Sequence, residues 1–206
     1  MPKKLPRPWP PSKPLRPSEV LPTREPLPIT VAIIGAGPLG RWLALSAARA
    51  GFRVLLEDVM PTNLHHAEEA LRAVLGPEAL PNVRFVSTIE DAVRDADLVI
   101  DCVPDELESK LEILWLLDRM APPRTVLATP TTRLSIADLA ACTYRPEKCI
   151  AIAAEARSLA AGAATEILLR TTSKTSPETI ALVEEFWRRI GFTPAFAADP
   201  AEQPTR

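Results

Sequence analysis

Three glycines and one acid carry the clearest chemistry in this sequence. The glycines are spaced as Gly35-x-Gly37-x-x-Gly40, and they follow an apolar run at 29–34. A helical pattern comes next, and Asp58 ends a second apolar run about 20 residues after the last glycine. This layout is typical of a dinucleotide-binding β-α-β unit, in which a pyrophosphate lies at the helix N-terminus and an acid binds the ribose.

Each residue of the glycine stretch has a physical reason to be there. Gly35 permits a tight turn after the first strand, and Gly37 has no Cβ to keep a pyrophosphate from the backbone. Gly40 lets the helix approach the sheet closely. Pro38 suits the first helical turn, where its missing N–H is no loss. We therefore expect phosphates to bind at the positive end of this helix.

The acid predicts which dinucleotide binds. A carboxylate at Asp58 would repel the 2′-phosphate of NADP, and no arginine follows it to offset that repulsion. The sequence therefore favours NAD. The alternative is a domain of the same fold whose crevice is empty.

The chain alternates strand and helix patterns from residue 29 to residue 199. This alternation predicts an α/β fold: a single Rossmann-type domain with a doubly wound, mostly parallel sheet. Residues 1–28 are rich in proline and form an expected disordered tail, although their Pro-x-x-Pro repeats also match peptides that dock in aromatic grooves. Residues 200–206 form a second, short tail.

Two local patterns make sharper structural predictions. The helix predicted at 106–120 has an expected core face of four leucines. These are Leu107, Leu111, Leu114 and Leu117. Capping boxes that begin at Ser135 and at Thr175 predict two further helix starts.

Composition excludes several classes of function. The net charge of −2 gives no reason to expect nucleic acid or an anionic membrane as a partner. No apolar run is long enough to span a membrane, and no signal-peptide core opens the chain. Three unpaired cysteines indicate reduced thiols and a cytoplasmic location. His65 and His66 are adjacent and lack a third ligand, so we expect solvated residues near a helix start rather than a metal site.

Several segments resemble the NAD-binding domain of the L-3-hydroxyacyl-CoA dehydrogenases. The most specific are Val103-Pro-Asp105 followed by Lys110, and the hydroxyl-rich stretch 129–135. The resemblance runs from about residue 29 to about residue 199, with further matching segments at 97–102, 136–141, 145–150 and 190–194.

The resemblance implies roles for particular residues. Asp105 and Lys110 match the acid and the lysine near the cofactor, and Thr132 matches a serine that meets the substrate and the nicotinamide. Glu166 matches the glutamate that orients a catalytic histidine, the base that takes the hydroxyl proton while hydride passes to NAD. The candidate cofactor-binding residues are therefore Gly35, Gly37, Pro38, Leu39, Gly40, Asp58, Val103, Asp105 and Lys110. The candidate catalytic residues are Glu166 and Thr132.

The sequence departs from the family pattern on the substrate side. The histidine motif is replaced by 153–157, in which Ala153 and Ala154 occupy the place of the base and Glu155 is the nearest alternative. The interval 58–87 is short, and Arg133 adds a charge at the crevice. We also expect the family's helical C-terminal domain, which builds the acyl pocket, to be absent. Losing a positioned base typically costs about 10²- to 10⁴-fold in rate.

Each candidate also has an ordinary structural explanation. Glu166 could pair with Arg170, and Lys110 could form a surface pair with Glu106. Thr132 could be a turn residue, and Asp105 could cap the helix that follows it.

Three functions remain open at the level of sequence. The first is a dehydrogenase acting on a hydroxyacyl thioester or a related hydroxy acid, with a partner subunit that supplies the helical domain. The second is an NAD-binding pseudoenzyme that serves as a sensor, subunit or scaffold. The third is an interaction protein with an empty crevice. The expected ligands are NAD(H) and an acyl-CoA, and retained NAD binding with weak or no independent activity is favoured.

Overall fold

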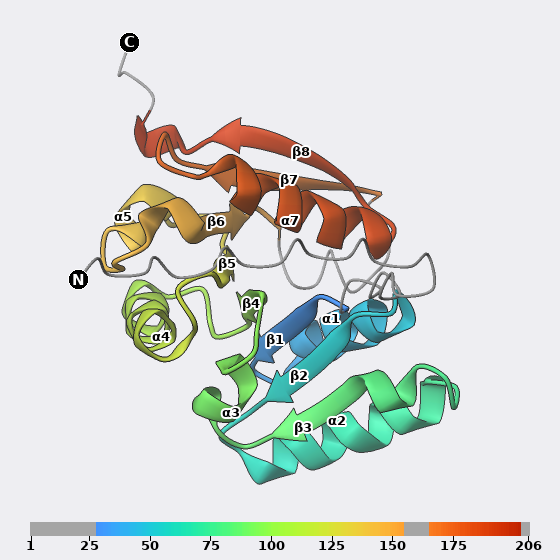
Figure 1. Ribbon diagram of the computed structural model, residues 1–206. Coiled ribbons are helices and arrows are strands. Elements are labelled where there is room, and N and C mark those ends of the chain that lie inside the picture. Colours follow the sequence, from blue (N-terminus) through green and yellow to red (C-terminus); the bar gives the residue numbers. More distant parts are fainter. Residues whose placement is uncertain (1–27, 155–164, 203–206) are drawn as a thin grey trace, which may run out of the picture.

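A computed structural model describes residues 28–154 and 165–202 of the chain. The strands in these ranges form one eight-stranded sheet in the order β3-β2-β1-β4-β5-β6-β7-β8 (Figure 1). They are β1 (Thr30–Ile34), β2 (Arg53–Glu57), β3 (Val83–Val86), β4 (Leu98–Asp101), β5 (Val126–Pro130), β6 (Cys149–Ile152), β7 (Glu166–Thr171) and β8 (Thr193–Ala198). All neighbouring strands are parallel except β6 and β7, which are antiparallel. The predicted doubly wound, mostly parallel sheet is confirmed.

The strand order reverses between β1 and β4, which are neighbours in the sheet although two strands separate them in sequence. Ligands of open α/β sheets bind beyond the carboxyl ends of the strands at such a reversal. The turns after β1 and β4 are therefore where a dinucleotide crevice belongs.

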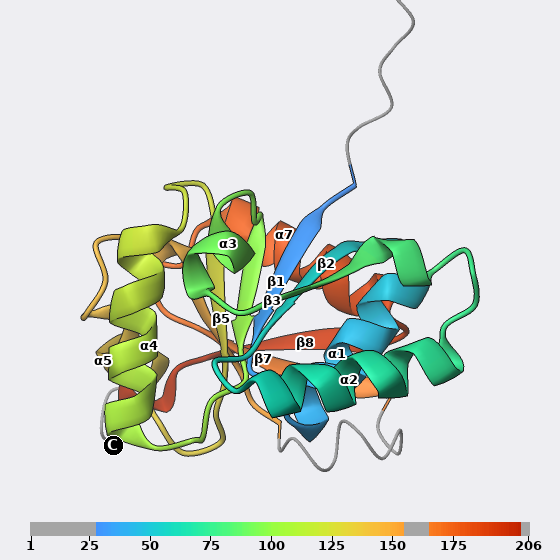
Figure 2. The same ribbon diagram turned by 90° about the horizontal axis from the view of Figure 1, so that it is seen from below.

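Helices cover both faces of the sheet, so the molecule has three layers (Figures 1 and 2). One face carries α1 (Pro38–Arg49), α2 (Pro61–Val74) and α7 (Pro177–Arg189), and the other carries α3 (Ile89–Val93), α4 (Leu107–Met120) and α5 (Ile136–Ala140). Alternate residues of each strand supply the two cores. In β1, for example, Val31 and Ile33 belong to the core under α1, and Ala32 and Ile34 belong to the core under α4.

One of the two capping boxes is confirmed, and the other is corrected by one residue. The hydroxyl of Ser135 accepts a hydrogen bond from the Asp138 amide and starts α5. The cap of α7 is Ser176 rather than Thr175. The Thr175 hydroxyl is already engaged, because it accepts from the Thr172 amide and donates to the Cys149 carbonyl.

The predicted core face of α4 is wrong in its first turn. Leu107 is 50% exposed, whereas Lys110 is completely buried one turn later. The buried stripe runs through Lys110, Ile113, Leu114 and Leu117. The spacing of apolar residues could not predict a lysine in the core. A buried cation needs a charged partner, and the sequence alone does not show which residue that is.

No helix among the described residues is both long and apolar enough to cross a membrane. The proline-rich segment 1–27 and residues 203–206 lie outside the described ranges, so the predictions made for both tails and for the domain boundaries stay predictions.

Candidate functional site

The glycine turn has the geometry that its sequence predicts. Gly35 has a φ of +102°, and its amide donates to the carbonyl of Glu57 at 2.8 Å. A Cβ on Gly40 would lie 1.8 Å from the Gly35 carbonyl oxygen, which no side chain allows. A Cβ on Gly37 would meet nothing within 4 Å. Gly35 and Gly40 are therefore needed to build the turn, whereas Gly37 leaves open space beside it.

The N-terminus of α1 is free to receive an anion. Gly37 is its N-cap, Pro38 is its first residue, no side chain caps it, and its first turn contains no acid. Amides at the start of a helix have no partner within the helix, and the helix dipole makes this end positive. Leu39 lies in this first turn and is almost completely buried. These features fit the pyrophosphate of a dinucleotide.

Asp58 lies directly beside this turn. Its carboxylate accepts from the Ala36 amide at 2.8 Å and from the Met60 amide at 2.8 Å. The side-chain amide of Asn63 bridges both oxygens at 3.2 Å and 3.1 Å. Asp58 is thus held in place by the glycine turn itself. Sequence reasoning missed Asn63, since an asparagine early in a helix carries no specific signal.

Arg41 is a second residue that the sequence argument overlooked. Its guanidinium donates to the Ala36 carbonyl at 3.1 Å, within the glycine turn. A positive charge is therefore held next to the site that fits the phosphates, and it strengthens the attraction for an anion there.

The turn after β4 lies against the glycine turn. A Cβ on Gly35 would lie 3.3 Å from the Cys102 carbonyl oxygen, and the Cys102 amide donates to the Ile34 carbonyl at 2.7 Å. Val103 follows directly, which places this candidate cofactor residue at the same crevice. Burial raises the pKa of the Cys102 thiol well above its usual range, which disfavours the reactive thiolate form.

Lys110 forms a buried ion pair with Asp101, the last residue of β4. Their charged atoms are 2.5 Å apart, and both side chains are fully buried. Burial raises the pKa of Asp101, and the neighbouring Lys110 opposes that effect only in part. The suggested surface pair of Lys110 with Glu106 is therefore wrong. The lysine lies beneath the crevice, where it joins α4 to the end of β4.

Asp105 and Thr132 connect the turns after β4 and β5. The Thr132 amide donates to one Asp105 oxygen at 3.2 Å, and the other Asp105 oxygen is buried without a hydrogen-bond partner in the described chain. Asp105 does not cap α4, whose N-cap is Glu106. The turn is closed by the Thr131 hydroxyl, which accepts from the amides of Arg133 and Leu134. The Thr132 hydroxyl, by contrast, accepts no backbone amide of this turn among the described residues.

The residue opposite Ala153 is Leu168. In the antiparallel β6–β7 pair, Ile152 faces Leu169, and the Ala153 amide donates to the Leu168 carbonyl at 2.8 Å. Glu166 is two residues further along and exposed, which makes it a diagonal neighbour of Ala153. It forms no ion pair with Arg170 among the described residues. Glu155 lies outside the described residues.

The two histidines are surface residues of α2. His65 lies 3.4 Å from Glu69, and both side chains are largely exposed. Within the described residues, no cluster of metal-ligating side chains is present. Both histidines lie in the first half of α2 and are exposed, as predicted for solvated residues near a helix start.

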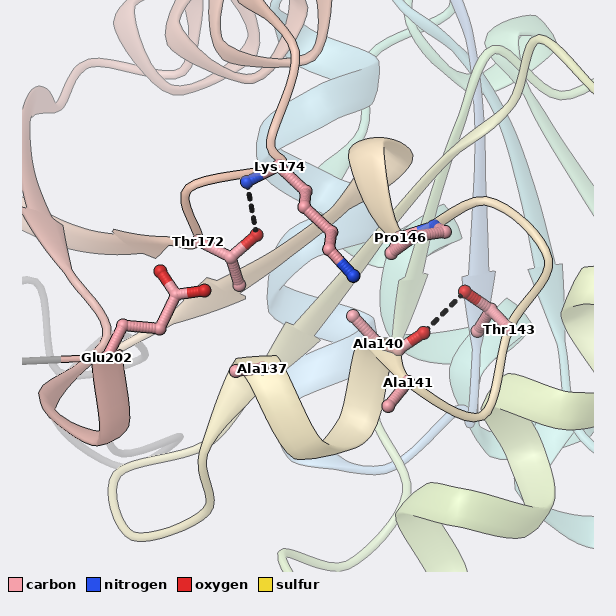
Figure 3. Close-up of a pocket in the computed structure, with 8 residues that line it drawn as sticks. All are labelled: Ala137, Ala140, Ala141, Thr143, Pro146, Thr172, Lys174 and Glu202. Carbon is pink, nitrogen blue, oxygen red and sulfur yellow. Dashed lines mark hydrogen bonds between the residues drawn. The ribbon is translucent and has the colours of Figure 1, made fainter.

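A separate pocket lies beside α5 (Figure 3). It is lined by Ala137, Ala140, Ala141, Thr143, Pro146, Thr172, Lys174 and Glu202. Pro146 precedes β6, and Thr172 follows the antiparallel β7, so both are at the amino ends of the parallel strands. This pocket is therefore distinct from the crevice at the carboxyl ends.

Glu57, which ends β2 next to Asp58, predicts a specific pH dependence. Burial, and then the charge of Asp58, raises the pKa of Glu57 to about 7. At pH values between the ordinary pKa of a glutamate and 7, Glu57 is deprotonated in the unfolded chain but still protonated in the folded one. The free energy of unfolding therefore falls as the pH rises through this range. The loss is complete above pH 7 and amounts to at most about 3 kcal/mol.

Replacing Glu57 with Gln should therefore reduce the difference in unfolding free energy between pH 5 and pH 8, as measured by urea titration. The exposed Glu106→Gln variant is the control and should behave as the unmodified chain does. An equal pH difference in all three proteins would contradict the assignment.

The sheet reversal, the open glycine turn and the acid beside it define a Rossmann-type dinucleotide-binding domain. The family model for the 3-hydroxyacyl-CoA dehydrogenase NAD binding domain matches residues 30–199. The chain belongs to this family, and its cofactor is NAD.

Relatives of known function and structure support this assignment. The chain is 32% identical over 133 residues to a probable 3-hydroxybutyryl-CoA dehydrogenase of Bacillus subtilis, covering 58% of this chain and 46% of that protein. It is 30% identical over 174 residues to the 5-formyl-3-hydroxy-2-methylpyridine 4-carboxylate 5-dehydrogenase of Mesorhizobium japonicum, covering 80% and 55%. A solved 3-hydroxyacyl-CoA dehydrogenase of Archaeoglobus fulgidus superposes with a TM-score of 0.70 at 27% identity, covering 83% of this chain and 57% of that one. The chain spans about half the length of these curated relatives.

Proposed function

We propose that this chain binds NAD(H) in the crevice between β1 and β4 and has weak or no dehydrogenase activity of its own. The observation that carries the proposal is a contrast between the nucleotide side and the substrate side of the crevice. The glycine turn, the uncapped α1 and Asp58 fit a dinucleotide, whereas Ala153 and Ala154 stand where the family pattern has its histidine base and offer no proton acceptor.

Each residue of the crevice has a proposed role in binding or positioning the cofactor. The first turn of α1 and Arg41 would bind the pyrophosphate, and Asp58 would bind the ribose once Asn63 releases part of its carboxylate. Asp101 and Lys110 keep the end of β4 in position. NAD supplies hydride transfer when it is bound. The reaction proposed for the family site is oxidation of a hydroxyl group in a 3-hydroxyacyl thioester or a related hydroxy acid.

Two uses of such a domain are compatible with this site. A protein subunit could supply an acyl-CoA pocket and a base, or the domain could act as an NAD sensor. The absence of a base at Ala153 favours the second use for the chain acting alone. We also propose a cytoplasmic location, because all three cysteines are free thiols.

The test of the proposal is NADH titration, followed by fluorescence, with Gly37→Val as the main variant. Because a Cβ at position 37 would meet no heavy atom of the described residues within 4 Å, the variant should fold with an unchanged melting temperature. The added branched side chain would fill the pyrophosphate site, and NADH affinity should fall roughly 100-fold. Gly76→Val is the matched control, since Gly76 also has open space around it and lies at the end of α2, away from the crevice. NADH binding that Gly37→Val leaves intact would refute the proposal.

A further inference from the structure

Two arginines place their guanidinium groups at the turn after β5: Arg133 belongs to that turn, and Arg170 reaches it from β7. Arg170, on β7, places both terminal nitrogens 3.4 Å from the Thr132 carbonyl oxygen. Arg133 donates to the Asp105 carbonyl at 3.2 Å. Both guanidinium groups therefore end beside the Asp105–Thr132 contact, and both are held by uncharged backbone oxygens.

Neither positive charge is neutralised by the part of the chain that the structure describes. Ion pairs in that part involve other arginines, such as Arg145, which lies 2.8 Å from the Asp118 carboxylate. The nearby Asp105 uses its carboxylate to accept the Thr132 amide and meets Arg133 only through its carbonyl. Since neither guanidinium has a carboxylate partner among the described residues, an anion bound at this turn would gain the attraction of both positive charges.

The arginines lie on the substrate side of the crevice. Arg170 faces the small residue Ala151 across the β6–β7 ladder, and it can therefore pass over β6 to reach Thr132. Two residues along the same ladder, Ala153 faces Leu168. Leu168 is 40% exposed and Arg170 is partly exposed, so this surface is accessible.

We propose that Arg133 and Arg170 bind the free carboxylate of a small hydroxy or keto acid. The planar guanidinium fork matches a carboxylate in two parallel hydrogen bonds, which a neutral acyl group cannot accept in the same way. This inference rests on the proposed function, and it narrows the substrate class from thioesters to free acids.

The experiment compares acetoacetate with its neutral analogue acetoacetamide by calorimetry, with NADH-saturated protein and with the free chain. Acetoacetate should bind roughly tenfold or more tightly than acetoacetamide. Arg170→Gln and Arg133→Gln should each abolish most of that preference, whereas Arg170→Lys should keep part of it. The exposed Arg53→Gln variant at the opposite end of the strands should leave it unchanged.

Equal affinity for the two compounds, or a preference that survives in Arg170→Gln, would overturn the inference while NADH binding stays intact. The converse result separates the two proposals. If NADH does not bind but the free chain still prefers acetoacetate in an Arg170-dependent way, the carboxylate site stands and the proposed function falls.

Discussion

Replacing Ala153 with histidine and Leu168 with glutamate is expected to raise the NADH-dependent reduction of acetoacetate by about 10²-fold or more. The two residues face each other across the β6–β7 ladder, so an imidazole at 153 and a carboxylate at 168 would be direct neighbours. The carboxylate would orient the ring and stabilise its protonated form, which restores a general acid and base beside Thr132. Steady-state consumption of NADH measures the change.

Two companion variants separate chemistry from altered packing. Ala153→Gln adds a polar side chain of similar size without a base, and it should leave the rate unchanged. Ala153→His alone has only the diagonal Glu166 to orient it, and its rate should fall between those of the unmodified chain and the double variant. If the unmodified chain turns over the substrate as fast as the double variant does, the assignment of a missing base is wrong.

The second large effect concerns stability. Lys110→Met should lower the free energy of unfolding by about 3–5 kcal/mol, because it removes the positive partner that the fully buried Asp101 has among the described residues. One Asp101 oxygen already lacks a hydrogen-bond partner in the described chain, so losing the ammonium leaves this carboxyl still less well satisfied. Urea unfolding at pH 7 measures the loss.

The double variant Lys110→Met with Asp101→Asn tests whether charge is the cause. It removes both charges and should recover a large part of the lost stability. Lys174→Met, at a lysine that lies outside this core, should change stability by less than about 0.5 kcal/mol. A Lys110→Met variant as stable as the Lys174→Met variant would show that the pair contributes nothing.

The fold was predictable because its signals are local. Apolar runs, the Gly35–Gly40 turn and the Ser135 capping box each indicate one element, and alternating strands and helices then leave few arrangements of the sheet. The cap of α7 was misplaced by one residue because Thr175 and Ser176 offer the same hydroxyl. Only the contact of Thr175 with Cys149, 26 positions away, decides between them.

The site was predictable only in part, because its remaining features depend on contacts between distant strands. Lys110 was identified near the cofactor, but its burial follows from Asp101 on β4 and could not be seen in the periodicity of α4. Glu166 comes from a sequence match and stays a prediction, and that match could not show the antiparallel register, in which Ile152 faces Leu169. The Arg170–Thr132 contact likewise crosses β6, so it could not be predicted from the spacing of residues in the sequence.

The hydrogen bond from the Ala36 amide to Asp58 affects how binding at the phosphate subsite and at the ribose subsite can be measured separately. It ties the segment that fits the phosphates to the carboxylate that fits the ribose, and the Glu57–Gly35 bond reinforces this connection. Substitutions at Asp58 and at Gly37 should therefore be non-additive in a double-mutant cycle, although one acts on sugar and the other on phosphate. Adenosine and ADP-ribose, compared across that cycle, would show the two subsites behaving as a single thermodynamic unit.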